Sequence, residues 1–399
     1  MDFLKLFLVA TLLTLIPGQI LRIPPASQLG ALTLSDISVF LLDGLFIFYA
    51  LSIRKSLKFP NRIVFPFILF IAWAISTLTR AMTVFTVAEV ATSALFIARF
   101  AAYFFLSVVC FNIVTKAQAT KWVNLILFVG TLYALIGFVQ FVIIPDLTFL
   151  TPLGWDPHQR RIVSTIIDPN FSGYIFVLIF SLATSLYLSA RQKTPYALMA
   201  IVSFVALILT FSRSSYLAFI AAVTVIGLIK SRKLLVLALL TLFLIFTIVP
   251  QVRARVVGAL TIDETSQARI ESWQNATVVI RDNPIFGVGF NTYRFAQERY
   301  NFFSPDNPLG GHSGGGVDSS LLLVLATTGA VGLFLFALFL TSVAKTVSRD
   351  VGSDPLRLAM LASFAALLVH SLFVNSLFFP QIMLLIFPLI GLASKDDTK

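Results

Sequence analysis

The feature that most restricts how this chain can fold is its succession of long apolar stretches, separated by short polar connections. Each stretch has roughly the 17–25 residues that an α-helix needs to cross the hydrocarbon core of a bilayer. Only 12% of the 399 residues are charged, about half of the ~25% that soluble domains carry. The sequence therefore predicts an integral membrane protein with many spans.

We divide the chain into twelve expected spans within a single polytopic domain, residues 1–399. Their ranges are 3–20, 33–53, 63–80, 90–115, 122–144, 171–190, 196–211, 214–230, 234–250, 317–344, 357–377 and 379–394. The expected fold class is an all-α integral membrane protein with about 12 transmembrane helices and both termini on one side. The first span follows Lys5 as in a signal peptide, but no small-residue cleavage site follows it, so we expect an anchor. The two spans that meet near Phe211 should form a tight helical hairpin.

Lysine and arginine set the orientation, because cytoplasmic loops carry an excess of them. With a cytoplasmic N-terminus, 17 of the 29 basic residues fall on the inner side, mostly in short loops. The outer side then has two long loops, 145–170 and 251–316, and the second is too long for a simple connector. The net charge of +11 is therefore mainly an orientation signal, and we expect no nucleic-acid partner.

The basic residues outside the inner loops are all arginine, although the chain has eleven lysines. They are Arg22, Arg80, Arg99, Arg160, Arg161, Arg213, Arg253, Arg255, Arg269, Arg281, Arg294 and Arg299. One explanation is that lysine is favoured in orienting loops and that the remainder is accidental. The other is chemical, since a planar guanidinium matches phosphate or carboxylate oxygens two at a time. The second explanation predicts an anionic ligand on the outer side.

Three arginine sites stand out on that side. Arg213, in "LTFSRSSYLAF", lies at a helix start among serines, a setting that favours an anion; the alternative is an arginine that only snorkels to the interface. Arg160 and Arg161 form a second cationic pair before "DPN", where Asp168 and Asn170 are expected to cap a helix.

The third site is in the large outer loop, 251–316. The stretch "ETSQARIESWQNATVVIRDNP" predicts an amphipathic helix over about 266–281, capped by Thr265 or Ser266. This helix would lie on the outer membrane surface or cover a cavity beneath it. Arg269 and Trp273 share one side of it, so Arg269 either contacts a ligand or stacks on the indole.

Buried polar residues have simpler interpretations. Arg99 lies inside a span, where a charge is costly, and should pair with Asp36 or Asp43. His370 should make a helix–helix hydrogen bond. His158 has no clear partner in the sequence.

The stretch "NPLGGHSGGGVDSSLLL" places His312 in a glycine-rich run just before an apolar span. A neutral imidazole can accept a proton near pH 7, and glycines let the backbone approach a substrate closely. Asp318 could orient the ring. The alternative is a surface histidine on a loop. The three scattered histidines suggest no metal site, and the sequence contains no P-loop, no nucleotide-binding glycine motif and no serine elbow.

In order, an arginine before "PN", "LTFSRSS", "R…W" with "NPIFGVGFNTY", a loop histidine and "TTGAVGLFLF" resemble the superfamily of O-antigen ligases and O-antigen polymerases. The resemblance is best over residues 160–340. It implies a bacterial inner-membrane protein with its active side outside the cytoplasm. It also implies a helical fold like that of the lipid-linked-sugar glycosyltransferases, without a metal or other cofactor.

In that family a glycan passes from undecaprenyl pyrophosphate to an acceptor hydroxyl, so the implied partners are a lipid-linked glycan donor, a glycan or lipid acceptor, and membrane lipid. Arg213 and Arg269 would hold the pyrophosphate, with Arg161 as a supporting contact and Arg160 beside it. His312 would act on the acceptor. Many members have His-Asn before the leucine-rich helix, whereas this chain has inserted glycines, so Asp318 is an alternative base.

Other functions stay open at this point. A transporter or flippase of a lipid-linked glycan would also be polytopic and lined with arginine, and it predicts internal repeats and broken helices. A non-catalytic scaffold would leave the 66-residue loop 251–316 unexplained. Ligase and polymerase share the donor and differ in the acceptor, and the sequence separates neither these two nor the oligomeric state.

Overall fold

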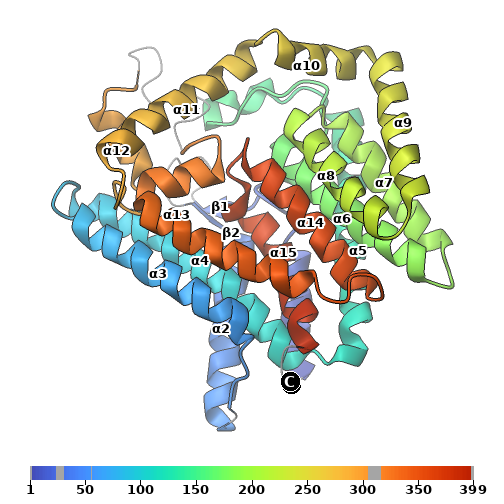
Figure 1. The fold of residues 1–399 in the computed structure, drawn as a ribbon, viewed down its shortest axis with the longest axis horizontal. Coiled ribbons are helices and arrows are strands. Elements are labelled where there is room, and N and C mark those ends of the chain that lie inside the picture. The colour runs from blue at the N-terminus through green and yellow to red at the C-terminus, as the bar shows by residue number, and fades with distance from the viewer. Residues whose placement is uncertain (1, 24–30, 55, 304–315, 397–399) are drawn as a thin grey trace.

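The computed structural model describes residues 2–23, 31–54, 56–303 and 316–396 (Figure 1). The helices of this part are α1 (Asp2–Leu13), α2 (Leu34–Ser52), α3 (Asn61–Ala81), α4 (Val87–Ile113), α5 (Ala119–Ile143), α6 (Pro169–Ser189), α7 (Thr194–Leu209), α8 (Arg213–Ile229), α9 (Arg232–Ile248), α10 (Pro250–Leu260), α11 (Glu264–Asp282), α12 (Tyr293–Arg299), α13 (Ser320–Val347), α14 (Pro355–Ser371) and α15 (Pro380–Ala393). Two short strands, β1 (Arg22–Ile23) and β2 (Leu32–Thr33), pair antiparallel. The nearly all-helical class expected from the apolar stretches is confirmed.

Each expected span coincides with a helix, though two helices end early. α1 stops at Leu13 and α14 at Ser371, several residues before the predicted ends at 20 and 377. Within the described residues, six helices (α2, α3, α4, α5, α6 and α13) are long and apolar enough to cross a membrane, and α7, α8, α14 and α15 are shorter apolar helices. The count of about twelve spans stays a prediction.

Within the loop predicted to lie outside, the described residues 251–303 are mostly helical. The chain bends by 95° between α9 and the stretch Pro250–Asp282; Pro250 is at the first position of α10, where its missing N–H costs nothing. In Figure 1, α9, α10 and α11 form an arch over one end of the helical body. α11 occupies the residues for which a helix was predicted, and its place at the membrane surface stays a prediction.

α11 begins two residues before the predicted start at 266. Its cap is Asp263 and not Thr265 or Ser266, since the Ser266 N–H donates to Asp263 Oδ1 at 3.0 Å. On its inner face, Ala276 and Val279 are buried against Leu323 and Ala326, two residues of α13. α11 therefore covers the outer end of α13.

α13 is broken at Gly329, whose backbone angles are φ 68° and ψ −173°. A side chain at this position would place its Cβ 2.0 Å from the carbonyl oxygen of Ile285, so only glycine fits. The break admits the segment 283–291, which contains the "NPIFGVGFN" motif.

Backbone groups freed by this break are paired with the motif segment. The N–H groups of Val288 and Gly289 donate to the carbonyls of Ala326 (3.0 Å) and Thr327 (2.9 Å). Beyond the break, the Ala330 N–H donates to Pro284 O at 2.8 Å. Broken helices also occur in transporters, where unwound carbonyls coordinate the substrate. In this protein the carbonyls of Ala326 and Thr327 already accept hydrogen bonds from the motif segment. The role of the motif segment is therefore to join α13 to the outer helices.

Loops that the sequence assigns to one side of the membrane contact one another. On the side predicted to be cytoplasmic, the Lys230 ammonium donates to Gly352 O at 3.0 Å, and the Lys58 N–H donates to Asn112 Oδ1 at 3.0 Å. On the opposite side, Arg299 pairs with Glu89 at 3.4 Å. These contacts are those expected if the connections alternate between two faces. Which face is cytoplasmic remains a prediction from the basic residues.

Reporter fusions test this orientation. Fusions after Lys58, Lys193 and Lys233 should report cytoplasm, whereas fusions within 251–316 should report the outer side, because short basic loops stay inside. An inverted pattern at any two of these sites would remove the basis for an outer arginine site.

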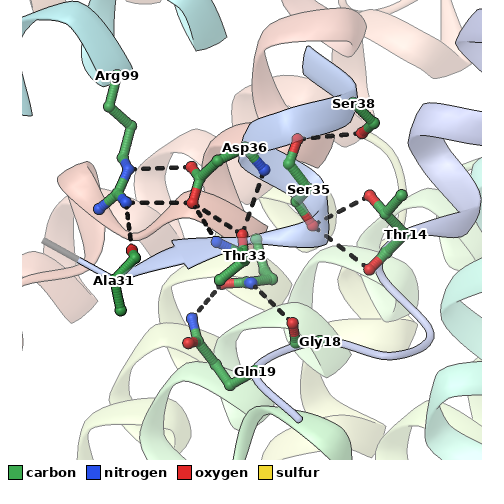
Figure 2. Close-up of polar contacts among 10 residues, drawn as sticks. Thr14, Gly18, Gln19, Ala31, Thr33, Ser35, Asp36, Ser38 and Arg99 are labelled. Carbon is green, nitrogen blue, oxygen red and sulfur yellow. Dashed lines mark hydrogen bonds and ion pairs between the residues drawn. The ribbon is translucent and has the colours of Figure 1, made fainter. Parts of the chain in front are cut away.

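The intramembrane charge of Arg99 is neutralised as predicted, and Asp36 is the partner of the two candidates. The Arg99 Nε lies 3.0 Å from Asp36 Oδ1, and its Nη2 donates to Asp36 Oδ2 (3.1 Å) and to Ala31 O (2.6 Å). The same carboxylate completes a capping box with Thr33 at the start of α2 (Figure 2). Because removing one partner of a buried pair costs roughly 3–5 kcal/mol, this bidentate contact fixes α2 to α4 and has a structural role.

Candidate functional site

Arg213 lies where two helices turn back on each other. α7 ends at Leu209 and α8 starts at Arg213, so three residues make the predicted tight hairpin. Ser212 caps α8 by accepting the Ser215 N–H at 3.4 Å. This places the Arg213 side chain at the first position of the helix, only 13% exposed.

The Arg213 guanidinium is held by the start of α11. Its Nη1 lies 3.1 Å from both carboxylate oxygens of Asp263, and its Nη2 donates to Oδ1 at 3.1 Å. Nη1 also donates to Ser266 Oγ at 3.1 Å. Burial alone would raise the pKa of Asp263, but the hydrogen bonds from Ser266 and Arg213 outweigh it and lower the pKa. Asp263 is thus an ionised carboxylate on the arginine fork.

Three further arginines surround this pair. Burial lowers the pKa of Arg161 to about 10, and the charges of Arg255 and Arg213 act in the same direction. The pKa of Arg255 is lowered by burial and then by the charge of Arg213. The pKa of Arg269 is likewise lowered by burial, and Arg213 adds to the shift. We call Arg161, Arg213, Arg255 and Arg269 the arginine cluster.

Mutual repulsion in the arginine cluster is only partly compensated. The negative charges that oppose it come from Asp168, Asp263 and Asp318. Within the part of the chain that the structure describes, Arg161 donates only to backbone carbonyls, to Thr210 O at 2.8 Å and Phe211 O at 3.3 Å. The Nε of Arg269 is buried and has no hydrogen-bond partner among the described residues. Since arginine stays charged at neutral pH, a bound anion would remove a standing electrostatic cost.

A cavity of about 650 Å³ opens next to the cluster, between the outer ends of α5 and α7 and the α9–α10 bend. Arg160, Arg161 and Arg255 line one part of it, and its apolar lining comes from Phe141, Pro145, Leu209, Phe211, Val249 and Ala254. A cavity with cations on one part and an apolar wall on the other suits an amphiphile with an anionic head. Of the four predicted arginines, Arg160 and Arg161 lie at this cavity, and Arg160 is exposed.

The start of α8 also rests on a buried histidine. His370 Nε2 lies 3.2 Å from Ser214 Oγ and 3.4 Å from Ser215 Oγ, and its Nδ1 lies 2.5 Å from Ser376 Oγ. The predicted helix–helix hydrogen bond of His370 is therefore confirmed, between α14 and α8.

Of the two helix caps predicted at 168–170, one is confirmed. Asp168 caps α6 by accepting the N–H groups of Asn170 (2.6 Å) and Phe171 (3.1 Å). Asn170 is not a cap: its side-chain carbonyl accepts the Ser212 hydroxyl at 2.7 Å. The sequence missed this because Asn170 and Ser212 meet only through the packing of α6 on α8.

His312 lies outside the described residues. Asp318 is described, and α11 holds its backbone: its N–H donates to Ser272 Oγ (3.1 Å), and its carbonyl accepts the Trp273 indole N–H (3.0 Å). The negative charge of Asp318 acts on Arg269, where it opposes the lowering of the arginine pKa. Asp318 thus lies at the edge of the arginine cluster. Trp273 points its polar edge at Asp318 and packs its ring near Phe373.

The fold gives His158 neighbours that the sequence did not reveal. One ligand atom each from Asp156, His158 and Asp168 lies within 4.8 Å of the other two, a spacing that a metal ion could use. The sequence predicted no metal site because its three histidines are scattered. In the structure, the chain around His158 brings this histidine close to two carboxylates. Asp168 already accepts two backbone N–H groups and acts on Arg161 and Arg269, and those positive charges work against a dication.

Residues 198–337 match the family model described as O-antigen ligase. The resemblance to the O-antigen ligase and polymerase superfamily is thereby confirmed. The O-antigen ligase match covers about a third of the chain, from α7 into α13, and includes Arg213, Arg255 and Arg269. A search of curated proteins finds no match. This match supports glycan transfer of the ligase or polymerase type by a multi-pass membrane protein.

Two residues of this O-antigen ligase region were missed as site residues. Arg255 was counted only among the outer arginines, and Asp263 was not singled out. Neither has a local signature. The 95° bend that returns α10 over the α7–α8 hairpin brings both to Arg213, and the all-arginine outer side was the one sequence signal that included Arg255.

Proposed function

We propose that this protein transfers a glycan from an undecaprenyl-pyrophosphate carrier to an acceptor hydroxyl on the outer face of the bacterial cytoplasmic membrane. The observation that carries the proposal is the arginine cluster beside a cavity with an apolar wall. A polyprenyl pyrophosphate has the matching shape, an anionic head on an apolar chain. The O-antigen ligase match supports the reaction class.

The arginine cluster would bind the pyrophosphate before and during the reaction. Planar guanidinium groups donate paired hydrogen bonds to phosphate oxygens. Arg213 already holds a bidentate carboxylate, Asp263, in the geometry that two phosphate oxygens would take. The polyprenyl chain would follow the apolar wall of the cavity toward the lipid.

In the transfer step, the acceptor oxygen forms a bond to the anomeric carbon of the donor sugar. The bond from that carbon to the pyrophosphate oxygen breaks, and its electron pair leaves with the pyrophosphate. Fixed cations stabilise the growing negative charge, the largest contribution to catalysis in many enzymes. The acceptor proton goes to a base, which we propose is His312, with Asp318 as the alternative. In this proposal arginines do the work that a divalent cation does elsewhere, and no cofactor or nucleotide is consumed.

Binding of the carrier lipid tests the proposal without requiring the acceptor. Purified full-length protein in nanodiscs should bind undecaprenyl pyrophosphate at least tenfold more tightly than undecaprenyl monophosphate, because a second phosphate adds charge-assisted hydrogen bonds. Arg255→Gln should lower pyrophosphate affinity by about tenfold to a hundredfold, since one such bond is worth roughly 1.5–3 kcal/mol. The measurement is native mass spectrometry or a titration of each lipid.

Arg253→Gln is the matched control, because Arg253 is exposed on the same helix, α10, and its replacement removes the same charge. Equal affinity for the two lipids, or equal losses in both variants, would show that the cluster does not recognise pyrophosphate.

A further inference from the structure

A second outer cavity, of about 240 Å³, lies beyond the far end of α11. It is formed by the end of α3, the turn that leads to α4, and the segment 283–300. Two cations, Arg80 and Arg299, line it together with Asn283, Tyr300 and Thr83. None of these residues belongs to the arginine cluster.

The two arginines of this cavity are in different states. Arg299 is held by Glu89 at 3.4 Å and by the Val84 carbonyl, and its guanidinium stacks on Phe85 at 4.2 Å. Arg80 stacks on Phe286 at 4.7 Å, and its guanidinium has no hydrogen bond or ion pair to any residue in the described ranges. Stacking orders the Arg80 side chain while leaving its N–H donors available. Arg80 is thus an ordered cation whose N–H donors are placed to bind an anion.

The remaining lining suits a polyhydroxylated ligand. The Tyr300 hydroxyl donates to Asp282 Oδ2 at 2.9 Å and accepts from Asn283 Nδ2 at 3.3 Å. The Tyr300 hydroxyl and the Asn283 amide therefore line the cavity, and the Asp282 carboxylate holds the tyrosine in place. Phe85 supplies an apolar surface. The volume is below the roughly 300–1,000 Å³ of drug-sized sites, which fits a ligand of about one sugar ring.

We propose that this cavity binds a negatively charged sugar, one that bears a carboxylate or phosphate, within the glycan substrate. The proposal rests on the proposed glycan transfer and adds a charge requirement to it. Arg269 and Asn283 are separated by fourteen positions along α11 and its end, which corresponds to about 21 Å at 1.5 Å per residue. The cavity would therefore read a sugar several units away from the bond that reacts.

The test uses full-length protein in phosphatidylcholine nanodiscs and two probes that differ in one group, methyl glucuronide and methyl glucoside. Ligand-observed NMR titrations give the two affinities. The glucuronide should bind at least tenfold more tightly than the glucoside. Arg80→Gln should abolish this preference, and Arg80→Lys should retain part of it because the charge remains.

Arg281→Gln is the matched control, since Arg281 is an exposed arginine of α11 that does not line the cavity. It should keep the preference. Arg213→Ala should also keep it while losing transfer, so failure of the charged-sugar site and failure of the transfer function give different results. Equal binding of both probes, or a preference that survives Arg80→Gln, would overturn the proposal. So would loss of glucuronide binding in phosphatidylglycerol nanodiscs, which would assign the cavity to a lipid headgroup.

Discussion

Arg213→Lys should reduce glycan transfer by about a hundredfold or more while the protein still accumulates in the membrane. Lysine keeps the positive charge but loses the paired donors that match phosphate oxygens. Removing one fixed donor to a developing oxyanion typically costs about 10²–10³ in rate. Arg213→Ala should be at least as damaging. The measurement is product formation from a lipid-linked glycan, normalised to the amount of protein in the membrane.

Arg213 also ties α8 to the start of α11 through Asp263, so a structural loss has to be separated from a chemical one. Asp263→Asn breaks the ion pair but preserves the cap, since asparagine caps helices as well as aspartate. This variant should keep far more activity than Arg213→Lys. Similar losses in both would mean that Arg213 only anchors α11, and normal product from Arg213→Ala would mean that it only snorkels.

His312→Ala should lower the transfer rate by roughly a hundredfold or more, the usual contribution of a general base. His312→Gln should fail as well, because an amide forms hydrogen bonds but takes no proton. Binding of the lipid-linked donor should be almost unchanged, since the arginine cluster holds it. The rate should fall as the pH drops through the histidine range, because the protonated ring is no longer a base.

Asp318→Asn separates the two candidate bases. If Asp318 accepts the proton, His312→Ala keeps most activity and Asp318→Asn loses it. Because the Asp318 backbone is fixed by Ser272 and Trp273, the amide replacement should leave the local fold intact. Near-normal turnover in both His312 variants would end the claim for that residue and leave the arginine cluster standing.

Local features of the fold could be predicted from the sequence because they depend on near neighbours. Apolar runs located the helices, and Asp168 was recognised as a cap from the residues that follow it. The charge of Arg99 inside a span predicted a carboxylate partner, and that partner is Asp36. Arg213 was identified from its serines and its position in the hairpin.

Long-range packing decided the rest. Thr265 and Ser266 are residue types that often cap helices, but the cap is Asp263. Asp263 also accepts hydrogen bonds from Arg213, and the sequence gives no sign of that contact. The "NPIFGVGFN" motif was useful for the family resemblance, whereas its physical role depends on a break in α13 forty residues further along the chain. Arg255 lies in the arginine cluster because the bend before α10 returns this helix over the α7–α8 hairpin.

Reconstitution of the wild-type protein distinguishes glycan transfer from transport of the lipid-linked glycan. Vesicles would contain purified protein and a labelled undecaprenyl-pyrophosphate glycan, with the acceptor present on the protein's outer side, and the reaction would be run with and without a chelator. We expect labelled acceptor and free undecaprenyl pyrophosphate in equal amounts under both conditions. Movement of the intact lipid-linked glycan between leaflets without any labelled acceptor would contradict it and identify a flippase.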